Sequence, residues 1–204
     1  AILKSFINTR ELPYFFLVLS WLIFGLLHSL LAAAFAKRFA MRVMKQSYKY
    51  YRLLYSLFAT ASLAWVLHNH FSITETIMWR PPVIEKIIAA IALLAGIAVM
   101  LVCIKKYFLY LSGIDVFMEG NTAPAALQTD GLHKYVRHPL YSGTLLFVWA
   151  LFLGYPYMNN LVSCICITLY TWIGLQFEEK KLLNEYGEAY REYQGRIPAL
   201  LPKL

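Results

Sequence analysis

The chain has few charged residues for its length of 204 residues. Charged side chains make up 15% of the sequence, whereas hydrophobic residues make up 60%. That apolar share is well above the share found in soluble domains. The apolar residues also gather in long runs, which excludes an ordinary soluble enzyme and indicates an integral membrane protein.

Cysteine is also scarce, because only Cys103, Cys164 and Cys166 are present, each inside or at the end of an apolar run. An odd number of cysteines in such segments excludes a disulfide framework. Cys164 and Cys166 are two residues apart, so on a helix they point in different directions and make a poor metal pair. The sequence also lacks a phosphate loop, a glycine-rich dinucleotide fingerprint and a serine-nucleophile elbow. We therefore expect no bound metal.

Acidic residues are missing from residues 37–52, a segment that contains six basic ones. This basic segment separates the first two of five predicted membrane spans, which are residues 13–36, 53–71, 83–104, 139–154 and 161–177. Fifteen lysines and arginines lie on one side of these spans and four on the other. Because basic residues favour the cytosolic side, we predict an all-α integral membrane protein with its N-terminus outside and its C-terminus in the cytosol. This topology accounts for the net charge of +8, so we expect no nucleic-acid partner.

The segment after the fifth span is predicted to form an amphipathic helix. Its apolar side chains recur at steps of three and four residues: Leu182, Leu183, Tyr186, Tyr190 and Tyr193. Such a stripe would lie on the cytosolic mouth of the bundle or on the membrane surface. We predict two regions, a three-helix membrane region over residues 1–106 and a ligand-binding region over residues 107–204.

Polar groups cluster at the cytosolic ends of the last two spans. Arg137 and His138 precede Pro139, which opens the fourth span, and Glu178 and Glu179 follow the fifth span. A tight turn joins the two spans, so both clusters lie at the same depth and are expected to be adjacent. An arginine fork suits a carboxylate or phosphate, and acids near a bilayer need a partner. The simpler interpretation is that the arginine reaches for headgroups, the histidine caps a helix and the acids are solvated.

Two tyrosines, Tyr135 and Tyr141, flank the Arg-His pair. Aromatic faces attract cations, although tyrosines at a membrane boundary can also form an interfacial belt. Together the clusters suit a ligand with a cation, a carboxylate, hydroxyls and a flat ring. S-adenosylmethionine fits this description, and so do several dinucleotides.

At these residues the chain resembles the membrane-embedded methyltransferases that include isoprenylcysteine carboxyl methyltransferase and the phospholipid N-methyltransferases. The resemblance rests on Gly131-x-x-x-Tyr135-Val136-Arg137-His138-Pro139-x-Tyr141-x-Gly143 and on Glu178-Glu179-x-x-Leu182, Tyr186-Gly187, Tyr190, Tyr193 and Pro198. The N-terminal half is similar to bacterial methanethiol S-methyltransferase-like and denitrification-accessory membrane proteins. That similarity rests on His28-Ser29, Tyr51-Arg52-Leu-Leu-Tyr55 and Gly113-Ile-Asp115.

The resemblance implies that S-adenosylmethionine binds on the cytosolic side, between the last two spans and the tail. By matching position, the implied cofactor-binding residues are Tyr135, Val136, Arg137, His138, Pro139, Tyr141, Glu178 and Glu179. Arg137 and Glu179 are the implied catalytic residues, and Glu179 or His133 is a candidate base. One departure from the pattern is Gln176, where many relatives carry a basic residue.

The implied reaction transfers a methyl group to an acceptor that enters from the lipid bilayer. We expect either a carboxylate of the isoprenylcysteine type or a small thiol. The alternatives are a phospholipid amine N-methyltransferase, a non-catalytic accessory membrane protein, and an NADPH-dependent enzyme of the sterol-reductase type. The expected location is a bacterial inner membrane, with the active site facing the cytosol.

Overall fold

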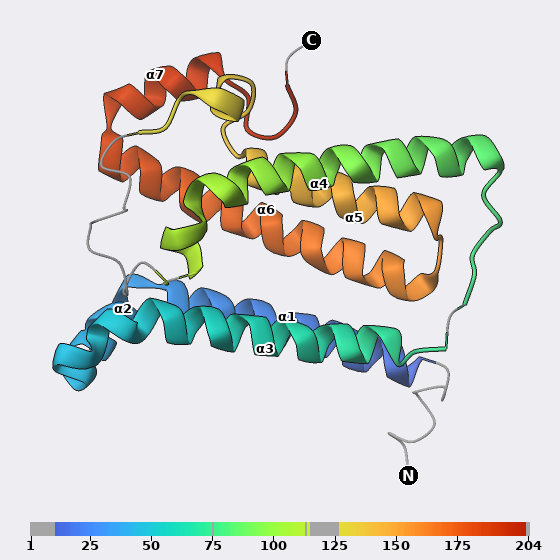
Figure 1. Ribbon diagram of the computed structural model, residues 1–204, viewed down its shortest axis with the longest axis horizontal. Helices are drawn as coiled ribbons and strands as arrows, with labels where there is room; N and C mark the ends of the chain where they lie inside the picture. Colours follow the sequence, from blue (N-terminus) through green and yellow to red (C-terminus); the bar gives the residue numbers. More distant parts are fainter. Residues whose placement is uncertain (1–10, 75, 113, 115–126, 203–204) are drawn as a thin grey trace, which may run out of the picture. The chain divides into compact units, whose positions relative to one another are not determined.

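The computed structural model describes residues 11–74, 76–112, 114 and 127–202 (Figure 1). Within these residues the regular structure is helical, and an isolated bridge pairs Ile77 with Tyr157. The predicted all-α class is therefore confirmed. In chain order the helices are α1 (Leu12–Ala32), α2 (Ala34–Met44), the 3₁₀ helix η2 (Lys45–Tyr50), α3 (Tyr51–Phe71), α4 (Val83–Ser112), the 3₁₀ helix η4 (Gly131–Lys134), α5 (Pro139–Gly154), α6 (Met158–Tyr186) and α7 (Glu188–Arg196).

Three of the described helices are long and apolar enough to cross a membrane. They are α1, the Val83–Lys105 part of α4, and α6. Helix α5 is apolar but has only 16 residues. Helix α3 has the same length as α1 but is less apolar, because polar residues such as His68, Asn69 and His70 interrupt its last turns. The chain therefore has the character of a membrane protein, and the count of five spans remains a prediction.

The chain divides into two compact units, and α6 runs from one into the other. The first unit holds α1, α2, α3 and the start of α6, whereas the second holds most of α4, all of α5, the rest of α6, and α7. The functional division into residues 1–106 and 107–204 is a separate prediction. Gly113 and Asp115 of the N-terminal resemblance lie outside the described residues.

In the first unit, hydrogen bonds join α1 to α3 and to the start of α6. The Tyr51 hydroxyl donates to the carbonyl of Leu31 at 2.7 Å. Toward the other end of these helices, the Trp21 indole donates to the Ser163 hydroxyl at 3.0 Å, and Nδ1 of His70 lies 2.9 Å from the same oxygen. Such polar contacts hold apolar helices together where water is absent.

In the second unit, α4 and α5 approach closely through two glycines. A Cβ atom on Gly96 would lie 2.8 Å from the backbone nitrogen of Phe147 and 2.9 Å from the carbonyl oxygen of Gly143. Only a residue without a side chain fits between two backbones at these distances. The packing therefore fixes the position of α5, whose first turn follows the Arg137-His138 pair.

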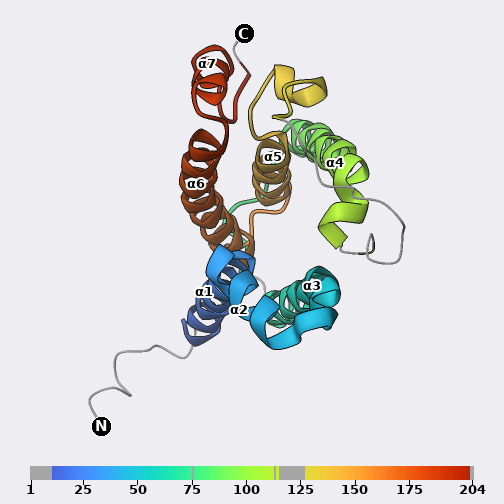
Figure 2. The same ribbon diagram turned by 90° about the vertical axis from the view of Figure 1, so that its left-hand side faces the viewer.

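The tail differs from the single amphipathic helix that the apolar stripe predicted. Helix α6 continues beyond the apolar span to Tyr186, and α7 begins at Glu188. Gly187 separates them with a φ of +58°, a left-handed conformation that favours glycine. The turn brings α7 next to the end of α6 in both ribbon views (Figures 1 and 2). The stripe is thus divided between two helices, and Tyr190 and Tyr193 face back toward the polar cluster.

Candidate functional site

Glu179 is the centre of a hydrogen-bonded cluster in the second unit. Its side chain is only 14% exposed. Arg137 donates to both carboxylate oxygens, from Nε at 2.9 Å and from Nη2 at 2.8 Å. The Tyr190 hydroxyl donates at 2.7 Å, the Gln194 amide donates at 2.6 Å, and Nε2 of His138 lies 2.5 Å from Oε1. A carboxylate has about four lone-pair sites, so little capacity remains for a further ligand.

The guanidinium of Arg137 donates its hydrogen bonds to other groups of the protein. Besides its two bonds to Glu179, its Nη1 donates to the backbone carbonyls of Ile197 and Gln194. Burial by itself would lower the pKa of Arg137, but the hydrogen bond and charge of Glu179 outweigh it and raise the pKa. Arg137 is therefore a fixed cation that ties the start of α5 to α6 and to the segment after α7.

His138 lies between the two glutamates. Its Nε2 faces Glu179, and its Nδ1 is 3.7 Å from a carboxylate oxygen of Glu178. The imidazole stacks on the ring of Tyr141, with the centroids 5.6 Å apart and the planes 11° from parallel. The Tyr141 hydroxyl in turn interacts with Glu178. The two stacked rings therefore lie beside the carboxylate of Glu178.

Glu178 differs from Glu179 in its exposure to solvent. Its side chain is 42% exposed, three times the 14% of Glu179. The two residues are consecutive on α6, and a helix turns by about 100° per residue, so they face different directions. Glu178 therefore presents the carboxylate that an incoming ligand can reach.

Tyr190, on α7, completes the shell around Glu179. Its side chain is fully buried. Burial and the hydrogen bond to Glu179 raise the pKa of Tyr190, which keeps the hydroxyl protonated as a donor. On the same helix, the Tyr193 hydroxyl donates to the backbone carbonyl of His133 at 2.6 Å. Helix α7 is thereby fixed against the loop that carries the Arg-His pair.

The segment after α7 is bonded to the start of α5. The backbone N–H of Arg137 donates to the carbonyl of Pro198, and that of His138 donates to the carbonyl of Ala199. The Ser142 hydroxyl donates to the carbonyl of Leu200 at 2.6 Å. The first two bonds satisfy the backbone donors of the two residues that precede α5, and these donors have no partner within the helix.

The structure brings together five of the residues predicted for the site, namely Arg137, His138, Tyr141, Glu178 and Glu179. The other three lie differently. Tyr135 is 65% exposed, Val136 is buried, and Pro139 forms the first turn of α5.

Sequence reasoning missed the roles of Tyr190 and Gln194, which both donate to Glu179. The sequence places Tyr190 in the apolar stripe and in the motif of the resemblance, without a role at Glu179. The requirement that a buried tyrosine hydroxyl find a partner was the signal that could have identified it.

A ligand at this cluster would meet a limited set of donors and acceptors. They are the Glu178 carboxylate, Nδ1 of His138 and the Tyr141 hydroxyl. His133, the other candidate base, is half-buried, and its Nδ1 lies 3.0 Å from the carbonyl oxygen of Arg137. Across the described part of the chain, no group of three or more His, Cys, Asp or Glu side chains is placed to hold a metal ion.

Comparison with known proteins identifies one family. The model of the family described as phospholipid methyltransferase matches residues 84–189, which is just over half of the chain. The match begins near the start of α4 and ends just after α7 begins, so it includes every side chain around Glu178 and Glu179 except Tyr190 and Gln194. No solved structure matches the chain significantly.

Several relatives are methyltransferases by name. A methanethiol S-methyltransferase from Crocosphaera subtropica is 29% identical over 193 residues, which cover 88% of this chain and 71% of the relative. One from Pseudomonas deceptionensis is 36% identical over 110 residues, covering 53% of this chain but only 40% of the relative's length. A protein-S-isoprenylcysteine O-methyltransferase from Schizosaccharomyces pombe is 35% identical over 80 residues, covering 37% of this chain and 33% of the relative.

Proposed function

Because the chain belongs to the phospholipid methyltransferase family, we propose that it is a membrane methyltransferase whose active site lies at Glu178 and Glu179. The family predicted from the motif residues is thereby confirmed, and the names of the relatives describe methyltransferases. The observation that carries the proposal is that the two glutamates differ in their hydrogen bonds and in their exposure. Glu179 is saturated by protein donors, whereas Glu178 is half-exposed beside two aromatic rings.

The proposed methyl donor is S-adenosylmethionine, which supplies an activated methyl group on a sulfonium. The chemistry of the site fits this cofactor. The Glu178 carboxylate suits its ammonium group, because a carboxylate near a membrane boundary gains from a cationic partner. The rings of His138 and Tyr141 offer flat surfaces for the remainder of the molecule.

Arg137 and Glu179 are proposed to serve this site by holding it in shape. Their bidentate bond fixes the end of α6 against the start of α5, and His138 is held between the two glutamates. Catalysis of methyl transfer depends mainly on positioning and on excluding water, so a rigid frame is an appropriate role. The hydrogen bonds that Glu179 already accepts speak against its acting as a base.

A small thiol is the acceptor that we favour. The relative that spans 88% of this chain is named for methanethiol, whereas the isoprenylcysteine relative aligns with only 37%. The carboxylate of an isoprenylcysteine is already ionised, whereas a thiol must lose its proton before it attacks the methyl group, so the thiol would react as the thiolate with its proton released to solvent. The carboxylate of an isoprenylcysteine is the second candidate, and a phospholipid amine is the third.

For the topology we propose five spans, with α3 and α5 added to the three long apolar helices. The N-terminus would lie outside and the site would face the cytosol of a bacterial inner membrane. The distribution of lysine and arginine, fifteen against four, supports this orientation. The acceptor would then reach the site from the bilayer.

The first test is calorimetric binding of S-adenosylhomocysteine to the detergent-purified chain. We expect binding that Glu178→Gln weakens about tenfold or more, because a hydrogen-bonded charge is lost. Glu185→Gln, an exposed acid on the same helix, is the matched control and should leave binding unchanged. Failure of the unmodified chain to bind the cofactor would contradict the proposal.

The second test uses isotope-labelled S-adenosylmethionine with three acceptors, namely methanethiol, a farnesylated cysteine and phosphatidylethanolamine. Label in dimethyl sulfide is the expected result. Label in the farnesylated cysteine or in the lipid would replace the thiol by the second or third candidate. Cofactor binding without any transfer would favour an accessory protein, and binding of NADPH alone would favour a reductase.

A further inference from the structure

Helix α2 of the first unit has a break in the helical backbone at each end. Ala33, between α1 and α2, is extended with a ψ of 149°, and Lys45, directly after α2, has a φ of +49°. One extended residue turns the chain through a corner, so α2 takes its own direction at the end of α1 (Figure 1). Its 11 residues extend over about 16 Å, roughly half the thickness of the hydrocarbon core of a bilayer. Helix α2 is therefore too short to cross a membrane, and its surface decides where it lies.

One side of α2 is apolar and exposed. Phe35, Phe39 and Val43 are 55%, 68% and 64% exposed. They follow one another at steps of four residues, and a helix turns by about 100° per residue, so they lie within an arc of about 80°. Ala40, next to this arc, is buried and faces the rest of the unit. We call the exposed arc of Phe35, Phe39 and Val43 the Phe face of α2.

Two arginines border the Phe face along one edge. Measured around the helix from Phe35, Arg42 lies about 20° away and Arg38 about 60° away, on the side opposite to Phe39. Both arginine side chains are exposed. A long cationic side chain beside an apolar face can keep its methylene groups on that face while its charge reaches a headgroup. Phenylalanines flanked by arginines are typical of a helix that lies in the surface of a membrane.

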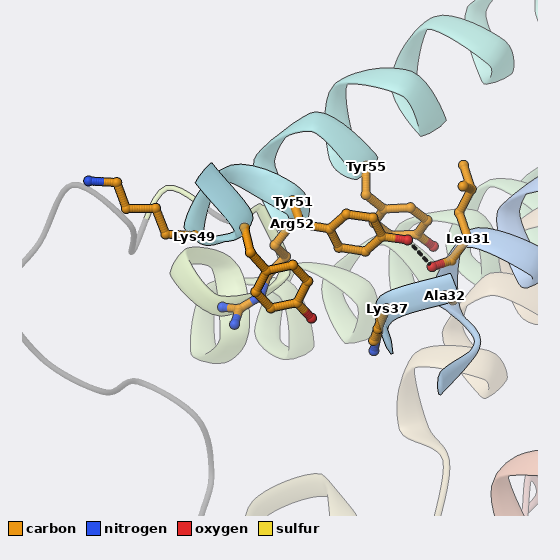
Figure 3. Close-up of a pocket in the computed structure, with 8 residues that line it drawn as sticks. Leu31, Ala32, Lys37, Lys49, Tyr51, Arg52 and Tyr55 are labelled. Carbon is orange, nitrogen blue, oxygen red and sulfur yellow. Dashed lines mark hydrogen bonds between the residues drawn. The ribbon is translucent and has the colours of Figure 1, made fainter. Parts of the chain in front are cut away.

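The side of α2 opposite the Phe face borders a pocket of about 450 Å³ (Figure 3). Lys37, which lines this pocket, lies about 160° around the helix from Phe39. Tyr51 lines the same pocket, and its hydroxyl donates to the carbonyl of Leu31 at 2.7 Å (Figure 3). This bond fixes the start of α3 to the end of α1, from which α2 departs. The Phe face is thus directed away from the pocket.

We propose that the Phe face docks on the surface of a bilayer that contains anionic phospholipid. Its three apolar side chains lie among the outer acyl methylenes, and the two arginines lie on the phosphates. Two observations favour this partner. Helix α1 is long and apolar enough to cross a membrane and ends at Ala32, so α2 begins where hydrocarbon meets water. The arginines beside the apolar residues complement a negatively charged surface. The proposal does not depend on methyl transfer.

A second copy of the chain fits the Phe face less well. A stable protein interface buries about 800 Å² on each partner, whereas one aromatic side chain contributes about 150–250 Å² when it is fully buried. Two phenylalanines and a valine that are already partly covered supply well below the required area. Docking on lipid has no such minimum here, because α1 already holds α2 at the bilayer.

Spin labels on opposite sides of α2 test the proposal in the full chain, reconstituted in nanodiscs of phosphatidylglycerol and phosphatidylcholine. Oxygen, which concentrates in lipid, and a water-soluble nickel chelate report the surroundings of each label. We expect labels at Phe39→Cys and Val43→Cys to collide mainly with oxygen. A label at Met41→Cys is the matched control, because Met41 is 47% exposed but lies about 160° around the helix from Phe39. The ratio of oxygen to nickel collisions should be severalfold lower there.

Two outcomes of the labelling would overturn the proposal. Frequent nickel collisions at all three positions would place the Phe face in water. Few collisions with either reagent at Phe39→Cys and Val43→Cys would mean that protein covers the face, from a second copy or from another part of this chain. The native cysteines are replaced by alanine, and the labelled unmodified chain supplies the baseline if that background does not fold. Phe35→Cys gives a further label on the same face if Phe39→Cys does not fold.

The lipid composition tests the role of the arginines. Each basic residue near an anionic surface changes membrane partitioning about fivefold. In discs of phosphatidylcholine alone, and in anionic discs with Arg38→Gln and Arg42→Gln combined, the ratio of inserted to water-exposed label at Phe39→Cys should fall about fivefold or more. Arg191→Gln is the control, because that arginine is 64% exposed on α7, and it should leave the ratio unchanged. Equal ratios in the two lipid mixtures would overturn the assignment of an anionic surface as the partner.

Discussion

The carboxylate of Glu179 and the guanidinium of Arg137 form a bidentate pair, with N–O distances of 2.9 and 2.8 Å. Both side chains are largely buried, at 14% and 10% exposure. Pairing satisfies both charges where water is scarce, so the pair is stable only as a whole. This pair is therefore a central interaction in the frame of the proposed active site.

Replacing one member of the pair should therefore destabilise the chain strongly. Glu179→Gln leaves the Arg137 charge buried without its counter-ion, and we expect a loss of about 3 kcal/mol, seen as a lower unfolding midpoint in detergent. Arg137→Gln should cost a similar amount. The double variant should cost clearly less than the sum of the two. Additive losses in this cycle would show that the two groups are not coupled.

The hydroxyl of Tyr190 gives a milder prediction. Tyr190→Phe removes a buried donor to Glu179 and keeps the ring, so we expect a loss of about 1–3 kcal/mol in the free energy of unfolding. Tyr186→Phe is the control, because that residue has no bond to the cluster among the contacts described, and it should change stability little. If Tyr190→Phe leaves the free energy of unfolding unchanged, Glu179 does not need the hydrogen bond that α7 supplies.

The close approach of α4 and α5 can be tested at Gly96. In Gly96→Ala the new methyl group would lie under 3 Å from two backbone atoms, so the helices must separate. We expect a loss of about 1–3 kcal/mol, together with weaker cofactor binding, because α5 begins at the site. Gly174→Ala serves as the control, since the nearest atom to its Cβ would be the Tyr141 hydroxyl at 3.8 Å. Comparable stability of the two variants would rule out tight helix packing at Gly96.

Gly187 tests the turn between α6 and α7. Its φ of +58° strains any residue with a Cβ, although no atom lies within 4 Å of where that Cβ would be. Gly187→Ala should therefore cost about 1 kcal/mol through backbone strain alone. Gly195→Ala in α7 also meets no atom within 4 Å, and its backbone is helical, so it should be neutral or slightly stabilising. The measurement is the thermal unfolding midpoint of the two variants. Because neither new methyl group meets another atom, a lower midpoint for Gly187→Ala alone reports backbone strain.

The sequence was sufficient to predict that the Arg-His pair and the acid pair meet. Two short apolar runs joined by a tight turn can only form a hairpin, which places residues 137–138 and 178–179 at one end of it. Which acid would face Arg137 was not predictable, because consecutive helical residues point in different directions and the rotation of α6 depends on packing. Tyr135, which the motif position predicts for the site, is 65% exposed, and its role stays a prediction.

The contribution of α7 was also beyond sequence reasoning. The apolar periodicity continued across Gly187, so the pattern predicted one helix instead of two. A glycine within a periodic stretch is tolerated in a helix at a cost of about 1 kcal/mol relative to alanine, so its presence alone does not predict a break. Tertiary contacts of Tyr190, Tyr193 and Gln194 decide the matter here, and they are visible only in the folded chain.

The partners of Arg137 are far from it along the chain, which has a consequence for biosynthesis. Glu179 follows Arg137 by 42 residues, and Gln194 and Ile197 follow it by 57 and 60. Translation therefore makes the cation before any of these partners exists. The site is completed only after α7 has left the ribosome, and a nascent chain that stalls before Glu179 lacks the counter-ion of Arg137.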